Sequence, residues 1–210
     1  MTTRVLVLRH GQTHGNVDGL FCGHTETELT PLGVAQARAA GRRLQHMEID
    51  AAYSSDLSRA ADTARHALEP KPDVAITHDR RIREMYYGDW EGRPGRDIGK
   101  ETPDLLRDFF QAKVHAAPGG ETIQQLRERT TGLVHEAVKA HDGGTILLVS
   151  HGNAIVAMLA EFLRLPIEAT WSMTCNNTSI TRMDFSKSGR FTLVGFNDYA
   201  HTEGLAEAGA

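Results

Sequence analysis

Val5-Leu6-Val7-Leu8 is a short aliphatic run that stops at the polar stretch Arg9-His10-Gly11-Gln12-Thr13. Far downstream, Thr145-Ile146-Leu147-Leu148-Val149-Ser150 stops in the same way at His151-Gly152-Asn153. Short aliphatic runs bounded by polar residues and glycine are typical of buried parallel strands. Ligands bind to open α/β sheets at the carboxyl ends of such strands. The two runs therefore predict that an arginine and two imidazoles meet at one end of a sheet, a combination suited to phosphate.

The composition is that of an ordinary globular chain of 210 residues, with 40% hydrophobic and 24% charged residues. This length favours a single domain over residues 1–210. The formal net charge of -4 argues against a nucleic acid or a membrane surface as partner. Cys22 and Cys175 lie far apart, which fits a reducing compartment better than a disulfide scaffold. The first apolar run is too short for a signal sequence or a membrane span, so we expect a cytoplasmic protein.

Strand and helix signals alternate along the chain. Strands are predicted at 4–8, 50–53, 74–77 and 145–150, and helices at 30–46, 56–68, 123–138 and 152–163. Two last strands, 178–185 and 190–196, are predicted to form a closing hairpin. Segment 10–28 is predicted to be a loop, 83–118 to be irregular, and 202–210 to be a frayed tail. This alternation predicts a three-layer α/β sandwich with a mostly parallel central sheet and helices on both faces.

Five segments of the chain, in one order, resemble the motifs of the histidine phosphatase superfamily, also called the phosphoglycerate mutase-like family. They are Arg9-His10-Gly11-Gln12-Thr13, Asn16, Ser54-Ser55-Asp56-Leu57-Ser58-Arg59-Ala60, Arg83-Glu84-Met85-Tyr86-Tyr87-Gly88-Asp89-Trp90-Glu91-Gly92 and Ser150-His151-Gly152. The resemblance spans nearly the whole chain. It implies a metal-independent phosphomonoester hydrolase that needs no cofactor, acts on a small phosphorylated metabolite and passes through a phosphohistidine at His10.

Residues of several of these motifs suit this chemistry on physical grounds. Arg9 and Arg59 carry forked donors that match phosphate oxygens. Two nearby guanidiniums also disfavour a positive charge on His10, and a neutral imidazole nitrogen is the nucleophile that phosphoryl transfer needs. The resemblance gives His151 the role of binding the transferred group. Gly152, at the start of the helix after it, adds backbone N–H donors.

Hydrolysis also needs a proton for the leaving group and a base for water. The resemblance assigns this role to Glu84. Asp89 and Glu91 are rival carboxyls in the same segment. The alternative for Glu84 is a surface ion pair with Arg81 or Arg83.

Smaller groups complete the predicted substrate site. Thr13 and Asn16 offer neutral hydrogen bonds, and Gly11 permits a close backbone approach. Cys22 and Gly23 lie in a loop that lines the substrate mouth in relatives. His10 and His14 are four residues apart, a spacing that suits a metal only on a helix. Because glycines predict a loop there, no metal is expected.

Two other functions compete with hydrolysis. Mutases of the family use a long insertion with paired arginines, but residues 93–117 are short and carry no adjacent arginine pair. This segment is predicted to form a lid, in which Phe109-Phe110 face either an apolar leaving group or the core. Tyr86, Tyr87 and Trp90 likewise either wall the site or pack in the core.

A non-catalytic phosphate-binding module is disfavoured because every catalytic residue type is present. The last hairpin offers an edge for a homodimer.

Overall fold

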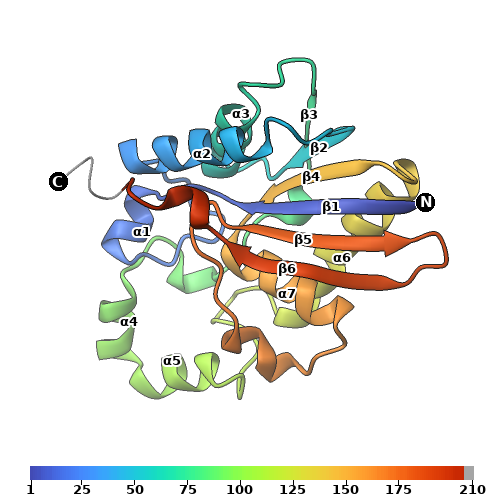
Figure 1. Ribbon diagram of the computed structural model, residues 1–210. Coiled ribbons are helices and arrows are strands. Elements are labelled where there is room, and N and C mark those ends of the chain that lie inside the picture. Colours follow the sequence, from blue (N-terminus) through green and yellow to red (C-terminus); the bar gives the residue numbers. More distant parts are fainter. Residues whose placement is uncertain (206–210) are drawn as a thin grey trace.

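A six-stranded sheet crosses the middle of the molecule, and its strands run in the order β3-β2-β4-β1-β5-β6 (Figure 1). The computed structural model describes residues 1–205; of the predicted tail, 202–210, residues 206–210 lie outside the described residues. The strands are β1 (Thr2–Arg9), β2 (Ala51–Ser54), β3 (Ile76–His78), β4 (Thr145–Ser150), β5 (Ile180–Ser186) and β6 (Phe191–Asp198). β1 to β4 are parallel, and the antiparallel hairpin β5–β6 closes one edge.

Helices cover both faces of the sheet (Figure 1). They are α1 (His14–Asp18), α2 (Pro31–Leu44), α3 (Ser58–Ala67), α4 (Gly95–Glu101), α5 (Pro103–Phe110), α6 (Ile123–Ala140) and α7 (Gly152–Phe162). Short 3₁₀ helices are η1 (Arg80–Ile82), η2 (Gly88–Trp90), η3 (Ile167–Ser172) and η4 (Ala200–Thr202). The predicted three-layer α/β architecture is confirmed, and every strand and long helix predicted from the sequence ends within two residues of its predicted bounds.

Strand β1 explains why the layers form. Val5 and Val7 pack against α6 and α7, whereas Leu6 and Leu8 face α2 and α3. All four side chains are at most 1% exposed, and burial of each stabilises the fold by about 2 kcal/mol. Alternation along a strand thus fills both cores, as is expected of a strand that is buried on two faces.

The pairing of β1 with β4 brings the two histidine motifs together. Arg9 is paired with Ser150 in this parallel register. The backbone N–H of His10 donates to the carbonyl oxygen of Ser150 at 2.9 Å. His10 and His151, which are far apart in the sequence, therefore leave neighbouring strands at the same level.

Two segments are more regular than the sequence predicted. Segment 10–28 contains α1, which Thr13 caps with its side chain and which ends at Gly19 in the left-handed conformation. Segment 83–118 contains η2, α4 and α5, so the prediction of irregular structure was wrong there. These helices have eight residues or fewer, which is too short to display a helical period in the sequence.

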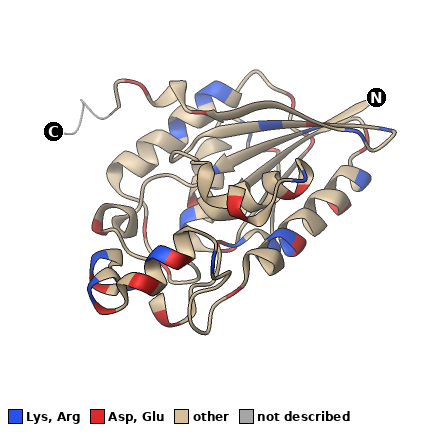
Figure 2. Cartoon of the chain, turned by 90° about the horizontal axis from the view of Figure 1, so that it is seen from below, with Lys and Arg blue, Asp and Glu red and all other residues tan. Residues whose placement is uncertain are grey.

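Helices α4 and α5 rest on a third apolar cluster, in which Trp90, Ile98 and Phe109 pack against Ile123 and Leu126 of α6. Figure 2 shows acidic and basic residues interspersed over the helices rather than gathered by sign. Within residues 1–205, no helix is long and apolar enough to cross a membrane. β6 is an edge strand, and the homodimer stays a prediction.

Candidate active site

His10 follows β1 and is held in one tautomer. Its Nδ1 lies 2.7 Å from the carbonyl oxygen of Gly11. A carbonyl oxygen only accepts, so Nδ1 carries the proton and Nε2 keeps its lone pair. Burial, together with the positive charges of Arg9 and Arg59, holds the pKa of His10 well below its usual value. The structure therefore presents a neutral imidazole whose Nε2 is nucleophilic.

Arg59 is buried beside the two histidines, and only 1% of its surface is exposed. It is therefore not a solvent-exposed charge on the surface of α3. Its Nη1 and Nη2 donate to three carbonyl oxygens of the loop before α2, those of Cys22, Gly23 and Thr25. Its Nε donates to Nδ1 of His151 at 3.2 Å. Arg59 is thus an immobile positive charge.

His151 complements His10. Because its Nδ1 accepts from Arg59, its Nε2 carries the proton, and this buried N–H has no hydrogen-bond partner within residues 1–205. Its ring centroid lies 5.2 Å from that of His10. Burial, with the nearby charges of Arg59 and Arg9, holds the pKa of His151 well below its usual value. His151 is thus a neutral donor beside the neutral imidazole of His10.

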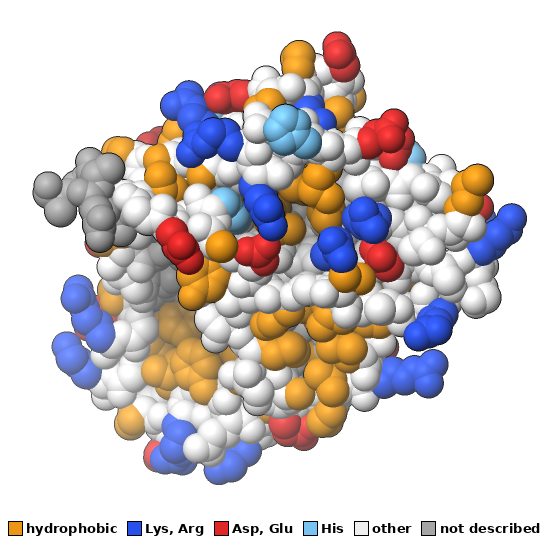
Figure 3. All heavy atoms as spheres, in the orientation of Figure 1, with side chains coloured by type: hydrophobic (Ala, Val, Ile, Leu, Met, Phe, Trp, Pro, Cys, Tyr) orange, Lys and Arg blue, Asp and Glu red, His pale blue; other side chains and the backbone are white. Residues whose placement is uncertain are grey.

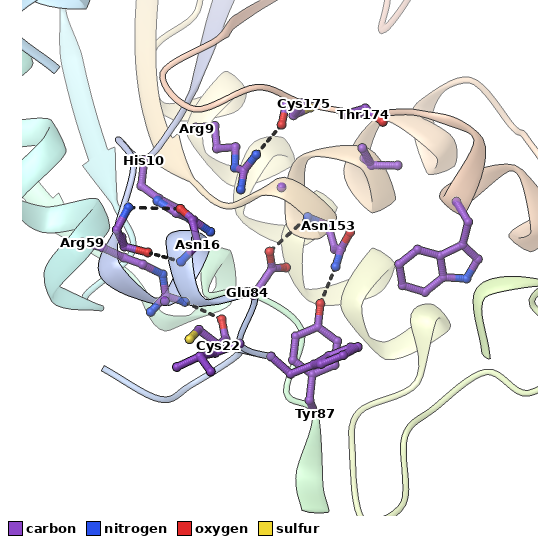
Figure 4. A pocket seen from close by; sticks show the side chains of 18 of the residues that line it. Arg9, His10, Asn16, Cys22, Arg59, Glu84, Tyr87, Asn153, Thr174 and Cys175 are labelled. Carbon is purple, nitrogen blue, oxygen red and sulfur yellow. Dashed lines mark hydrogen bonds between the residues drawn. The ribbon is translucent and has the colours of Figure 1, made fainter. Parts of the chain in front are cut away.

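Arg9 adds the second guanidinium. Its Nη1 donates to the carbonyl oxygen of Cys175, while its Nε is buried without a partner in the described chain (Figure 4). Burial lowers the pKa of Arg9. An ideal Cβ at Gly152 would lie 3.5 Å from Nε of Arg9, so the absence of a side chain there leaves this guanidinium open. Unpaired buried donors are costly unless a ligand satisfies them.

Glu84 lies opposite, at the N-terminus of α7 (Figure 4). Its Oε1 accepts from the backbone N–H groups of Met85 at 2.8 Å and Ala154 at 3.1 Å. Its Oε2 accepts from the N–H of Asn153 at 3.1 Å. The residue is only 7% exposed, so the alternative of a surface ion pair is wrong. Arg81 pairs instead with Asp79 and Glu136, and Arg83 with Asp56.

These groups surround a pocket of about 540 Å³. Seven residues predicted for the site line it together with Glu84: Arg9, His10, Thr13, Asn16, Cys22, Arg59 and Gly152. Gly11, Gly23 and His151 are not among the described residues that line it. A Cβ at Gly11 would come within 2.4 Å of the carbonyl oxygen of Gly33, so this glycine permits an approach to α2 rather than to a ligand.

Comparison with known proteins decides the family. A model of the histidine phosphatase superfamily (branch 1) matches residues 5–199. The chain belongs to this superfamily. It is 34% identical over 198 residues to the adenosylcobalamin/alpha-ribazole phosphatase of Salmonella typhimurium, covering 94% of this chain and 97% of that protein. It is 36% identical over 176 residues to the glucosyl-3-phosphoglycerate phosphatase of Mycobacterium tuberculosis, covering 80% and 78%.

A solved structure agrees with this assignment. YhfR of Bacillus stearothermophilus superposes with a TM-score of 0.91 at 31% identity, covering 96% of this chain and 100% of that one. The predicted family, fold class and enzyme class, a phosphoric monoester hydrolase, are confirmed.

The two rival carboxyls of this histidine phosphatase occupy other places. Asp89 does not line the pocket. Glu91 accepts backbone N–H groups of His24, Thr25 and Tyr87. Burial alone would raise the pKa of Glu91, but these hydrogen bonds, the Thr25 hydroxyl first, outweigh it and lower the pKa. Glu91 therefore fixes the loop whose carbonyl oxygens hold Arg59.

We expect Glu91→Gln to damage both stability and activity. In either orientation its NH₂ would face two N–H or O–H donors, because each carboxylate oxygen of Glu91 accepts two hydrogen bonds. The free energy of unfolding should fall by about 2 kcal/mol. kcat/KM should fall about 10- to 100-fold as Arg59 loses its fixed position. Urea denaturation and steady-state kinetics measure these effects. Asp89→Asn is the matched control and should change neither; an unchanged kcat/KM in Glu91→Gln would contradict this role.

His10 and His14 occupy different surroundings. His14 is exposed at the start of α1, whereas His10 is buried just after β1. Among residues 1–205, no three histidine, cysteine or acidic side chains are grouped to hold a metal ion.

Sequence reasoning missed two residues of the site, Asn153 and Arg129. The Asn153 side chain donates to the Tyr87 hydroxyl, and both residues line the pocket (Figure 4). Arg129 of α6 donates to the carbonyl oxygens of Arg81, Arg83 and Glu84 and so anchors the acid-bearing segment. Asn153 follows the second histidine motif directly, which was a signal available in the sequence. Arg129 looked like any charged residue of an amphipathic helix.

Proposed function

We propose that this histidine phosphatase hydrolyses phosphomonoesters of small metabolites through a phosphohistidine at Nε2 of His10, without a metal or cofactor. One observation carries this proposal. Two buried donors, Nε of Arg9 and Nε2–H of His151, have no partner within the described part of the chain. Arg9 lines the pocket together with His10, and the ring centroid of His151 lies 5.2 Å from that of His10. A phosphoryl group on His10 gives both donors the oxygen acceptors that they lack.

The first step transfers the phosphoryl group to the enzyme. Nε2 of His10 attacks phosphorus, and the bond from phosphorus to the leaving oxygen breaks. Glu84 protonates that oxygen, so a neutral alcohol departs. The carbonyl oxygen of Gly11, which accepts from Nδ1–H, stabilises the positive charge that the ring acquires. The charges of Arg9 and Arg59 balance the phosphoryl oxygens.

The second step returns the enzyme to its starting state. The Glu84 carboxylate takes a proton from water as that water attacks phosphorus. The bond from phosphorus to Nε2 of His10 breaks, and inorganic phosphate leaves. Glu84 regains the proton that it gave to the first product, so the cycle is balanced. We also propose that the protein works in a reducing compartment, as the sequence predicts. Cys22 and Cys175 are both free thiols, which suits such a compartment.

The mutase alternative lacks a site for the carboxylate of a phosphoglycerate. Arg93 and Lys100 pair with Glu101 and Asp97 and do not line the pocket. Phe110 of the proposed lid, 93–117, lines the pocket instead. The relatives named above are phosphatases.

The proposal is tested by hydrolysis of 4-nitrophenyl phosphate in excess EDTA. Nitrophenol and inorganic phosphate should appear in equal amounts, at the rate seen without chelator. With 3-phosphoglycerate and a bisphosphoglycerate primer, any turnover should yield phosphate and no 2-phosphoglycerate. Loss of activity in EDTA would contradict metal independence, efficient isomerisation would favour a mutase, and phosphate binding without turnover would favour a binding module.

A further inference from the structure

The part of the pocket next to Glu84 is walled by aromatic rings from four separate segments. Phe21 follows α1, Tyr87 precedes η2, Phe110 ends α5 and Trp171 lies in η3. Ring centroids are 5.0 Å apart for Phe21 and Tyr87, 6.2 Å for Phe21 and Phe110, and 5.4 Å for Phe110 and Trp171. We call these four rings the aromatic wall. Figure 3 shows hydrophobic side chains in a hollow on the side of the molecule where α4 and α5 lie.

The aromatic wall begins where the leaving group must lie. The leaving oxygen has to approach Glu84 to receive its proton. Asn153 joins Glu84 to the wall, because its backbone N–H donates to Oε2 of Glu84 and its side chain donates to the Tyr87 hydroxyl (Figure 4). Burial and the nearby Glu84 raise the pKa of Tyr87 well above its usual value, so this ring is neutral. The inference rests on the proposed role of Glu84.

Contacts within the protein hold the wall in place. Arg127, which is 4% exposed, donates to the carbonyl oxygens of Leu165 and Pro166 and to the Thr170 hydroxyl. This fixes the segment that carries Trp171. Phe110 is 48% exposed, although its ring contacts those of Phe21, Trp171 and the buried Phe109. A preformed apolar surface recognises a flat apolar group at little cost in ordering.

A charged leaving group finds no partner here. Among the residues that line the pocket in the described chain, the cationic side chains are Arg9 and Arg59, at the phosphate end. Arg59 already donates through Nε, Nη1 and Nη2 to protein acceptors. A carboxylate against the aromatic wall would lose water without gaining a cation, which is unfavourable.

We propose that the substrate is the phosphomonoester of an uncharged alcohol that carries an aromatic ring close to the ester oxygen. The ring lies on the aromatic wall while the phosphoryl group lies between Arg9, Arg59 and His10. Esters of hydroxy acids are rejected, because their carboxylate would lie against the aromatic wall without a cationic partner. This substrate class differs from the phosphoglycerate-derived compound named for the mycobacterial relative.

Three esters of primary alcohols test the substrate class without a large change in leaving-group chemistry. They are 2-phenylethyl phosphate, ethyl phosphate and 2-(4-carboxyphenyl)ethyl phosphate. We expect kcat/KM for the first to exceed that for each of the others by roughly 10- to 200-fold. Equal values, or a preference for the carboxylated ester, would overturn the substrate class while leaving the phosphatase proposal intact. Absence of hydrolysis with all three would overturn the substrate class, and turnover of 4-nitrophenyl phosphate would then decide the phosphatase proposal separately.

Variants of the wall add a second readout. Phe110→Ala and Trp171→Ala should lower the ratio of kcat/KM for 2-phenylethyl phosphate over ethyl phosphate at least about fivefold, mainly through KM. Tyr199→Ala is the matched control, because Tyr199 is 44% exposed and lies outside the pocket. An unchanged ratio in both wall variants would overturn the inference. If either variant fails to fold, the ester series on the wild type still decides the substrate class.

Discussion

His10→Ala should lose activity by roughly 10,000-fold or more, because it removes the atom to which the phosphoryl group is transferred. The wild type, mixed rapidly with excess ester and quenched, should carry one phosphoryl group per chain, seen as added mass. A phosphorus–nitrogen bond is labile to acid and stable to alkali, whereas a serine ester survives acid and an acyl phosphate is cleaved by alkali. Stability of the added group to alkali together with its loss in acid therefore identifies histidine.

The pH of this experiment follows from the pKa of His10, which burial and the two arginines hold well below its usual value. A lowered pKa means that the ring takes up a proton only at lower pH. At about pH 6.5, where an ordinary imidazole is about half protonated, His10 stays neutral and reactive. His14→Ala is the control, since His14 is exposed and does not line the pocket. A phosphorylated His10→Ala chain, or equal losses in both variants, would contradict the assignment.

The parts of the site that the sequence predicts are those set by local patterns. Aliphatic runs mark β1 and β4, and each ends at its histidine, so the parallel register that joins Arg9 to Ser150 brings both motifs together. Helices α1, α4 and α5 were missed because they owe their positions to caps and to the apolar cluster around Trp90 and Phe109 rather than to a long period.

Roles that depend on long-range contacts could not be read from the sequence. Glu84 and Glu91 lie in one segment and differ only in what they meet, the N-terminus of α7 for one and the loop at residues 24–25 for the other. The aromatic wall was equally hidden, since each of its rings comes from a different segment. The sequence left open whether Phe109 and Phe110 face the core or the leaving group, and each alternative holds for one of them. Phe109 is buried in the core, and Phe110 lines the pocket.

Glu84→Gln should slow turnover by about 100- to 10,000-fold for esters of alkyl alcohols, the range expected for loss of a positioned general acid and base. The amide cannot protonate the leaving alkoxide, nor can it take a proton from water. The substituted side chain would also place an NH₂ against a backbone N–H, either that of Asn153 or those that now donate to Oε1 of Glu84. Thermal unfolding must therefore be measured beside the kinetics.

The two roles of Glu84 separate when the leaving group needs no proton. 4-Nitrophenolate departs unprotonated, so Glu84→Gln should still transfer its phosphoryl group to His10 from 4-nitrophenyl phosphate. Water attack on the phosphoenzyme, however, would lack its base. We therefore expect a burst of about one nitrophenolate per active site followed by slow turnover, with the phosphohistidine accumulating. An alkyl ester should give no burst, because its first step is the slow one.

The matched control for this experiment is a carboxyl in the same segment that lies outside the pocket. Asp89→Asn removes such a group and should behave as the wild type with both esters. If Glu84→Gln turned over both esters at the wild-type rate, the proton would be coming from another group, and Asp89 and Glu91 would return as candidates. If Glu84→Gln shows a burst with the nitrophenyl ester and none with the alkyl ester, both proton transfers belong to Glu84. Loss of the acid slows the first step with the alkyl ester, and loss of the base slows the second step with the nitrophenyl ester. Loss of a single group has both effects only if that group serves first as acid and then as base.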